Sequence, residues 1–324
     1  MAREDAAAGG DASEATVGEP GDGGPRCGFI CVLGAPNVGK STLVNRLVGA
    51  KVSIVSPKVQ TTRARVLGIA MAGESQLLLV DTPGLFQPRQ RLDQAMVSAA
   101  WEGTADADAI VLLVDSARGA GDGEARVVDW LRGRGRQAIL VLNKVDAVDK
   151  RRLLALAQTL NGAGVFAETF MISALTGDGV ADLTAQFARI VPPGPWLYPA
   201  DQLSDMPQAL LAAEITREKA FWRLQQELPY AIAVETEAWA AFDDGSVRID
   251  QTIWVERDGQ RGIVIGKNGQ RLKEIGALAR HEMETAFERR VHLFLHVKVR
   301  PDWKNNPVFY RLHGLPFPGG GASH

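Results

Sequence analysis

Short apolar runs alternate with amphipathic stretches between residues 26 and 191. Apolar runs of this length, bounded by turn residues, are typical of buried strands, and the stretches between them have the spacing of helices that cover a sheet. The pattern therefore predicts an α/β domain built on a doubly wound, mostly parallel sheet. We expect its strands at 28–33, 66–71, 77–80, 109–114, 138–142 and 168–172.

A proline-rich segment, 192–207, precedes a different pattern and predicts an interdomain linker. Beyond it the order helix, strand, strand, helix, helix, strand predicts a smaller α+β domain over 208–304, followed by a C-terminal tail, 305–324. The expected elements are a helix at 208–227, strands at 230–240 and 247–257, a short apolar helix ending at 265, a helix at 270–288 and a strand at 292–300.

Composition is ordinary for a soluble globular protein of 324 residues, with a net charge of −2. The charge is uneven. Residues 1–25 hold six acidic side chains against one basic, without the apolar stretch of a signal peptide, so we expect a disordered acidic tail. Residues 257–311 hold twelve Lys and Arg against six Asp and Glu, which favours a polyanionic partner, although solvated charge alone also explains it.

Further classes are excluded by what the chain lacks. No apolar run is long enough to cross a membrane, and the five histidines form no metal-ligand pattern. Cys27 and Cys31 would lie about 13 Å apart on a strand, too far for a disulfide. We therefore expect reduced thiols in the core, in a reducing compartment.

A glycine-rich turn follows the first predicted strand and opens a helix. It has the spacing Gly, four residues, Gly-Lys-Ser, which predicts a P-loop that wraps a phosphate chain with its backbone N–H groups. A purely structural glycine turn is the alternative. Lys40 would reach the β- and γ-phosphates, and Ser41 would bind Mg²⁺. The predicted nucleotide-binding residues here are Gly34, Ala35, Pro36, Asn37, Val38, Gly39, Lys40, Ser41 and Thr42.

Polar motifs follow two further strands, at the sheet edge where ligands bind in such folds. Asp81, Thr82, Pro83 and Gly84 end the run 77–80, where the aspartate would hold Mg²⁺ through water and the glycine N–H would meet the γ-phosphate. An ordinary turn is the alternative. Leu85 follows, and its side chain is unable to orient a water molecule, so intrinsic hydrolysis should be slow or assisted.

Asn143, Lys144 and Asp146 close the run 138–142. Guanine presents two N–H donors to one carboxylate and adenine does not, so Asp146 is placed to select guanine, while Asn143 braces the neighbouring loops. A solvated turn is the alternative. Ser173 and Ala174, after the last strand, would let a backbone N–H approach the guanine O6. The order of the motifs predicts a guanine-nucleotide-binding P-loop protein of the P-loop NTPase fold.

Two residues carry weaker predictions. Thr62, just before a basic residue, is preferred over Thr61 as the threonine that completes the Mg²⁺ shell beside Ser41 and Asp81. Asn37 would help to hold a monovalent cation, K⁺, beside the phosphates, and a turn-forming role explains it equally well. Lys40, Thr62 and Gly84 are the predicted catalytic group. The loops 51–65 and 83–92 would change order between GTP and GDP states.

The basic C-terminal region contains a Gly-x-x-Gly turn after Ile263-Val264-Ile265. Such a turn between helices clamps a nucleic-acid backbone, and its context predicts an RNA-binding KH domain of type II, with a solvated basic helix face as the alternative. The predicted RNA-binding residues are Gly266, Lys267, Asn268, Gly269, Arg271 and Lys273.

These motifs, together with the segments 213–219 and 227–230, resemble over residues 26–304 the Era-type family of bacterial ribosome-associated GTPases with a C-terminal KH domain. The resemblance implies a monomeric, cytoplasmic switch that binds GTP, GDP and Mg²⁺ and is often stimulated by K⁺. It implies binding to 16S ribosomal RNA near the 3′ end, assistance to assembly of the 30S subunit, and peripheral association with the inner membrane. The acidic start and the Pro307-containing tail depart from the family pattern.

Two other functions stay open at this point. The first is an RNA chaperone in which GTP acts as a conformational ligand with negligible turnover. The second is a tRNA-modifying or double-GTPase relative, against which the single P-loop and the turn at 266–269 argue.

Overall fold

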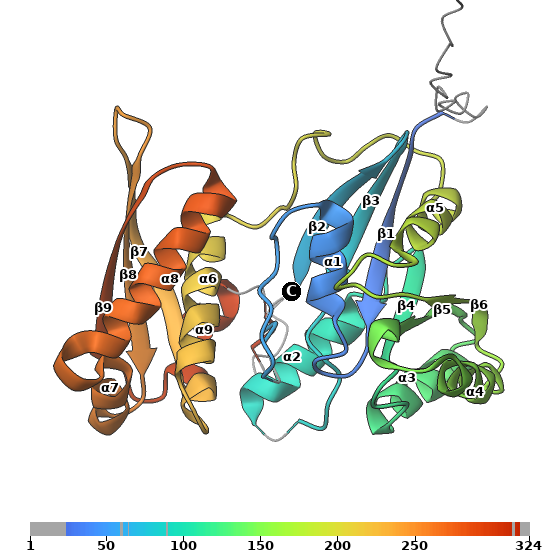
Figure 1. Ribbon diagram of the computed structural model, residues 1–324, viewed down its shortest axis with the longest axis horizontal. Helices are drawn as coiled ribbons and strands as arrows, with labels where there is room; N and C mark the ends of the chain where they lie inside the picture. Colours follow the sequence, from blue (N-terminus) through green and yellow to red (C-terminus); the bar gives the residue numbers. More distant parts are fainter. Residues whose placement is uncertain (1–23, 59–60, 64, 89, 313–314, 318–324) are drawn as a thin grey trace, which may run out of the picture.

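The computed structural model describes residues 24–58, 61–63, 65–88, 90–312 and 315–317. Most of the predicted acidic tail, and residues 59, 60, 64, 89, 313, 314 and 318–324, lie outside these ranges. The described chain forms two domains side by side, joined by the linker 192–207 (Figure 1).

A six-stranded sheet forms the N-terminal domain. Its order is β2-β3-β1-β4-β5-β6, with only β2 antiparallel to its neighbour. Every strand lies within two residues of its predicted bounds, so the sequence located the sheet correctly. The strands are β1 (Arg26–Leu33), β2 (Val66–Ala72), β3 (Ser75–Asp81), β4 (Ala109–Asp115), β5 (Ala138–Asn143) and β6 (Phe166–Met171).

Helices cover both faces of this sheet, as the continuous apolar runs require. One face packs against α1 (Lys40–Val48) and α5 (Val180–Ile190). The other packs against α2 (Arg91–Glu102), α3 (Asp122–Gly133) and α4 (Lys150–Asn161). Cys27 and Cys31 are buried and free in this core. The carboxyl ends of the parallel strands therefore share one edge, where the predicted nucleotide motifs meet.

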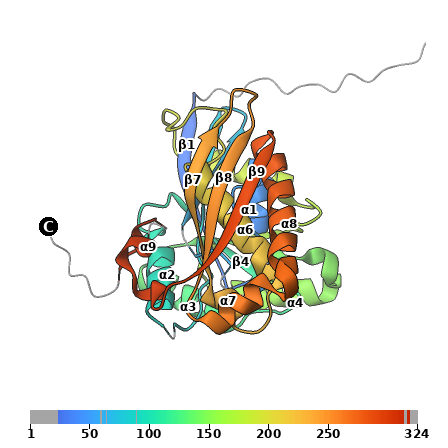
Figure 2. The same ribbon diagram turned by 90° about the vertical axis from the view of Figure 1, so that its left-hand side faces the viewer.

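The C-terminal domain is a three-stranded sheet with helices on one face. The strand order is β7-β8-β9, with β8 and β9 parallel, and Figure 2 shows the outer face of the sheet without a helix of the described chain in front of it. This is the α+β order expected for a KH domain. Its elements are α6 (Gln208–Arg223), β7 (Ala233–Ala241), β8 (Val247–Val255), α7 (Asp258–Ile265), α8 (Gln270–Phe287) and β9 (Val291–Val299).

The predicted helix at 208–227 and the strand starting at 230 need correction. The helix ends at Arg223, because Leu224 is extended, and residues 228–231 form a 3₁₀ turn with Pro229 near its start. Leu224 and Leu228 keep a helical i, i+4 spacing beyond Arg223, so the apolar pattern continues past the true end of the helix. The strand then starts at Ala233, and the next strand ends at Val255, two residues before its predicted end.

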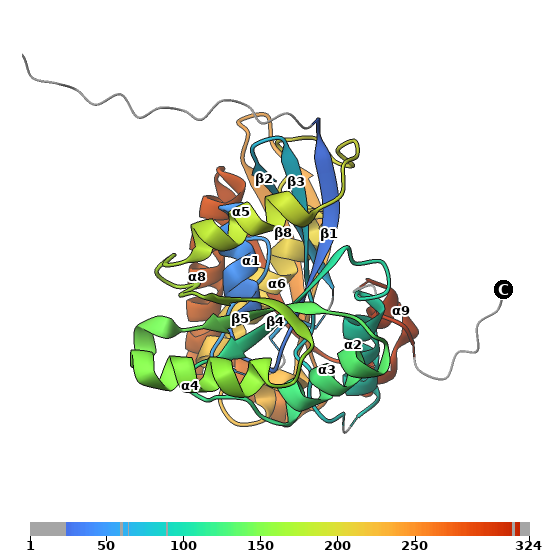
Figure 3. The same cartoon turned by 90° about the vertical axis from the view of Figure 1, so that its right-hand side faces the viewer.

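The C-terminal tail also differs from the expectation. Residues 307–312 form α9, and Tyr310 and Leu315 are buried against α2 of the first domain. Aromatic side chains between 303 and 317 supply this contact, so the C-terminal segment connects the two domains on the side visible in Figure 3. Packing therefore extends beyond the boundary predicted at residue 304.

Candidate nucleotide site and its contact with the C-terminal domain

The glycine-rich turn has backbone angles that side chains rarely adopt. Gly39 has φ 104° and lies directly before α1, and a Cβ there would clash with the side-chain nitrogen of Asn143. A Cβ on Gly34 would clash with the carbonyl oxygen of Leu113 in the same way. The turn therefore needs glycine at these two positions, and it leaves the first N–H groups of α1 facing an open cavity.

Lys40 is the buried cation of this turn. Its Nζ donates to the carbonyl oxygens of Gly34 at 3.1 Å and Ala35 at 3.0 Å. Burial lowers the pKa of Lys40 from 10.5 to about 8, against the opposing effect of Asp81. A bound phosphate chain would stabilise the charged form of this lysine, which burial disfavours.

Asp81 lies at the centre of a cluster of hydroxyl groups. Its Oδ2 accepts from Ser41 at 2.7 Å, Ser53 at 2.7 Å and Thr62 at 3.3 Å, and Ser41 Oγ lies 2.9 Å from Thr62 Oγ1. Its Oδ1 is buried without a hydrogen-bond partner among the described residues. Burial raises the pKa of Asp81. Hard oxygen donors around a carboxylate with an unused oxygen fit a Mg²⁺ site.

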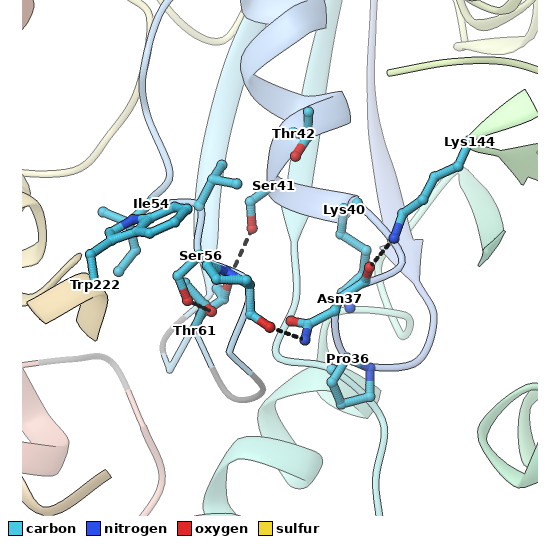
Figure 4. Close-up of a pocket in the computed structure, with 15 residues that line it drawn as sticks. Pro36, Asn37, Lys40, Ser41, Thr42, Ile54, Ser56, Thr61, Lys144 and Trp222 are labelled. Atoms are coloured by element: carbon cyan, nitrogen blue, oxygen red, sulfur yellow. Dashed lines mark hydrogen bonds between the residues drawn. The ribbon is translucent and has the colours of Figure 1, made fainter. Parts of the chain in front are cut away.

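Asn143 joins two of the loops that the sequence predicted to bind the nucleotide. Its side chain donates to Val38 O at 2.8 Å and accepts from Ala174 N at 2.9 Å, so it braces the P-loop against the loop after β6, as predicted. Lys144 donates to Asn37 O at 2.8 Å (Figure 4). It also pairs with Asp115 at 2.7 Å. Sequence reasoning missed Asp115.

Three further predicted residues lie at this edge of the sheet. Asp146 is exposed in a 3₁₀ turn directly after the β5 strand end, with its side chain accessible to a base. Ser173 is buried, and its hydroxyl accepts from Thr176 N at 3.1 Å. Thr42 follows Ser41 on α1 and lines the cavity.

The loop after β3 passes against the P-loop. Thr82 donates to Val32 O at 2.7 Å, and a Cβ on Gly84 would stand 2.9 Å from Pro36, so only glycine fits there. Leu85 donates its N–H to Gly34 O at 3.0 Å, while its side chain is buried in the core. Leu85 thus contributes its backbone to the site, and its side chain points away from the cavity.

A cavity of about 400 Å³ lies between the P-loop, the loop 51–65 and Gly84. Asn37 of the P-loop contacts the loop 51–65, because its side-chain N–H donates to Pro57 O at 2.8 Å (Figure 4). Trp222 of α6 also lines this cavity, beside Ile54, and is 56% exposed. The C-terminal domain therefore forms part of the wall, which no sequence motif indicated.

The C-terminal domain also forms hydrogen bonds and an ion pair with the loop 51–65. Glu218 of α6 is buried, accepts the N–H of Val55 at 2.7 Å and pairs with Lys51 at 2.6 Å. Arg63 donates to Ile232 O at 2.8 Å, and burial, followed by repulsion from Arg217, lowers the pKa of Arg63 to about 9. The same loop thus contacts the cavity beside the P-loop on one side and the C-terminal domain on the other.

The Gly-x-x-Gly turn joins α7 and α8 with left-handed backbone angles. Gly266 has φ 74°, Asn268 φ 51° and Gly269 φ 74°, and Lys267 and Asn268 are exposed. A Cβ on Gly266 would stand 2.8 Å from that of Arg271, which folds back to donate to Ile263 O. Lys273 is exposed on α8. The turn presents its backbone and a lysine to solvent, as binding to a phosphate backbone requires.

Two features are absent from the described part of the chain. None of its helices combines the length and hydropathy that a membrane crossing requires. No group of three or more His, Cys, Asp or Glu side chains in these residues is placed to hold a metal ion.

Comparison with known proteins matches both domains. Residues 29–144 match a family model described as a 50S ribosome-binding GTPase, and residues 227–304 match a KH domain. GTPase Era of Bradyrhizobium sp. (strain ORS 278) is 55% identical over 300 residues, covering 93% of this chain and 98% of that protein. GTPase Era of Rhizobium meliloti (strain 1021) is 56% identical over 294 residues, covering 90% and 94%.

Two solved structures have the same arrangement of both domains. One is Era in complex with MgGDPNP and nucleotides 1506–1542 of 16S ribosomal RNA, with a TM-score of 0.84, 38% identity, and coverage of 90% of this chain and 99% of that one. The other is a single-residue variant of Aquifex aeolicus Era bound to GDP·AlF4⁻, with a TM-score of 0.84, 38% identity, and coverage of 89% and 99%. The chain therefore belongs to the Era family of GTPases.

Proposed function

We propose that this GTPase is a nucleotide-gated RNA switch that binds the 3′ end of 16S ribosomal RNA and assists assembly of the 30S subunit. The observation that carries the proposal is the placement of the loop 51–65 between the nucleotide cavity and the KH domain. The solved Era complex with nucleotides 1506–1542 of 16S ribosomal RNA supports the RNA partner. The exposed turn at 266–269 is the part of this chain that would hold it.

Different residues of the cavity would hold the phosphates, the base and the metal ion. The P-loop N–H groups and Lys40 would hold the phosphates, and Asn143 fixes the loops that frame the base, which Asp146 would select. Ser41, Thr62 and Asp81 would hold Mg²⁺, which would supply positive charge against the phosphates. The N–H of Gly84 would sense the γ-phosphate.

Leu85 follows Gly84, at the place where a side chain would orient the attacking water. Leu85 is buried, so slow intrinsic hydrolysis is the expected behaviour. Asn37, whose amide N–H donates to Pro57 O at 2.8 Å, would help to hold a monovalent cation, K⁺, beside the phosphates through its side-chain oxygen, as an electrostatic aid to hydrolysis. Replacing K⁺ by Na⁺ should then lower the steady-state rate in wild type and leave an Asn37→Ala variant unchanged.

The same buried Leu85 favours a second candidate function, an RNA chaperone in which GTP acts mainly as a conformational ligand. An RNA-stimulated steady-state rate separates the two, because a chaperone with negligible turnover would show none.

The expected cell biology is a cytoplasmic monomer with peripheral association to the inner membrane. Sedimentation of the purified protein, alone and with anionic vesicles, tests that expectation.

The central experiment measures the affinity of the full-length protein for an oligonucleotide with the 3′-terminal sequence of 16S ribosomal RNA. It is done with a non-hydrolysable GTP analogue and then with GDP. We expect a preference of about tenfold for the GTP state, or about 1.4 kcal/mol of coupling. Equal affinities would show that the two domains act independently on this RNA.

A further inference from the structure

One fully buried arginine connects the KH domain to the nucleotide site. Arg217 of α6 has a side chain that is 1% exposed. Its Nη2 donates to the carbonyl oxygen of Thr61, and its Nε donates to Glu214 at 2.7 Å. The guanidinium also lies over the Phe221 ring, 5.1 Å from the centroid. Three partners on different sides therefore fix its orientation.

The two threonines that follow in the loop face opposite ways. Thr61 turns its hydroxyl toward Ser56, at 2.6 Å, and the carbonyl oxygen of Lys58, at 2.7 Å. Thr62 turns its hydroxyl into the cavity, 2.9 Å from Ser41 Oγ. The carbonyl that Arg217 holds belongs to the peptide bond between these two residues. Because that peptide is planar and rigid, fixing its oxygen fixes the start of Thr62.

We propose that Arg217 is a positioning residue for the GTP site, which holds Thr62 in place through the carbonyl of Thr61. The inference rests on the role proposed above for Thr62. A threonine at this point contacts the Mg²⁺ shell only when a γ-phosphate is present, so a displaced Thr62 weakens the GTP state and leaves the GDP state unchanged. Docking of the KH domain thus favours GTP, and GTP favours docking by the same factor.

Because Arg217 is buried, its contact with Thr61 affects the stability of the docked domain as well as that of the loop. Its Nη1 has no hydrogen-bond partner in the described part of the chain, so the group already carries an unused donor. Withdrawal of the loop would leave Nη2 with its bond to Glu214 alone, and a buried N–H that loses its acceptor costs free energy. The ordered loop and the docked domain therefore stabilise each other.

The test compares Arg217→Met, which keeps an unbranched apolar stem without the donors, with Arg217→Lys, which keeps the positive charge and one donor nitrogen. Arg223→Met on the same helix is the control, because Arg223 is about half exposed and its ion pair with Glu274 is long, at 3.9 Å. Affinities for a non-hydrolysable GTP analogue and for GDP are measured with Mg²⁺. We expect Arg217→Met to bind the analogue about tenfold more weakly and GDP as wild type does. Arg217→Lys should be intermediate, and Arg223→Met should match wild type.

A second arm identifies the route of the effect. If Arg217 acts through Thr62, Arg217→Met added to Thr62→Ala should cause no further loss of analogue affinity. Equal losses for GTP analogue and GDP, or additive losses in the double variant, would overturn the proposal. Arg217→Lys keeps the test decisive if the methionine variant does not fold. RNA affinity of the wild type in each nucleotide state is a separate readout, so failure of the gated switch is distinguishable from failure of this inference.

Discussion

Glu218 of the KH domain accepts the backbone N–H of Val55, in the loop beside the nucleotide cavity, at 2.7 Å. The same carboxylate is 3% exposed and pairs with Lys51 at 2.6 Å and with Lys219 at 2.9 Å. Glu282 of α8, the helix that follows the Gly-x-x-Gly turn, pairs with both lysines. The cluster therefore links the loop beside the nucleotide cavity to α8 through charged groups.

Glu218→Ala should destabilise the protein by about 3 kcal/mol, because removing one partner of a buried pair leaves the other charges uncompensated. Urea denaturation of the full chain measures the loss. Glu237→Ala is the matched control, since the Lys298–Glu237 pair is largely exposed and should contribute below about 1 kcal/mol. A loss no larger than that of the control would show that the buried cluster is not a structural contact of the two domains.

Nucleotide binding should take up a proton above neutral pH. Burial lowers the pKa of Lys40 to about 8, whereas a bound phosphate chain favours the charged lysine and restores a higher value. Between pH 8 and 10.5 the nucleotide-free protein has lost a proton that the unfolded chain keeps, so its stability should rise with pH in that window.

Calorimetry of GDP binding in buffers of different ionisation enthalpy measures the uptake. We expect Lys40 to take up about half a proton at pH 8 and almost none at pH 6.5, where it is charged before binding and where the phosphate of GDP instead releases protons. An uptake that is the same at both pH values would assign the proton to another group.

Asp146→Asn should change the base preference. A carboxylate accepts from the two N–H donors of guanine, whereas an amide presents one donor and one acceptor, which suits xanthine with its oxygen at the 2-position. We expect GTP affinity to fall by at least about 100-fold and XTP affinity to rise, because a buried polar group is left unpaired with the wrong base. Competition between the two nucleotides measures both, and retention of GTP preference would show that Asp146 does not contact the base.

Lys267→Ala should weaken RNA binding and its dependence on salt. An exposed lysine in the Gly-x-x-Gly turn would neutralise one phosphate, so the slope of log K against log salt should fall by about 0.7 for single-stranded RNA. Lys150→Ala, at the exposed start of α4 in the other domain, is the control and should leave the slope unchanged. An unchanged slope for Lys267→Ala would remove this residue from the RNA contact.

Local spacing explains what the sequence predicted well. Gly39, Lys40 and Ser41 fall within one turn, and Asp81 and Asn143 end apolar strands, so the parallel topology brings them to one edge without further information. Asp115 was missed although it ends β4 in the same way and pairs with Lys144. The same rule, a polar residue closing an apolar run, would have found it.

Contacts between domains were not predictable in this way. Glu218 is separated by 163 residues from Val55, and Trp222 reaches the cavity from a helix whose apolar pattern indicated only core packing. Ser53 joined the Asp81 cluster from a loop with no motif. These positions depend on how two independently patterned domains dock, which periodicity within either domain does not encode.

The C-terminal segment offers a last test, because it was expected to be a tail. Tyr310 is fully buried, donates its hydroxyl to Lys304 O at 2.8 Å and packs edge-to-face on Phe317, 5.0 Å between centroids. Tyr310→Ala should therefore lower the free energy of unfolding by about 3 kcal/mol, and Tyr310→Phe, which loses only the hydrogen bond, by about 1 kcal/mol.

Urea denaturation again provides the measurement, with Phe294→Ala on the open face of the KH sheet as the exposed aromatic control. That control should lose less than about 1 kcal/mol, because its ring is partly in water in the folded state. Since Tyr310 packs in one cluster with α2, the alanine variant should also expose α2 to hydrogen exchange. Protection of α2 equal to wild type would show that the segment is anchored to the KH domain alone.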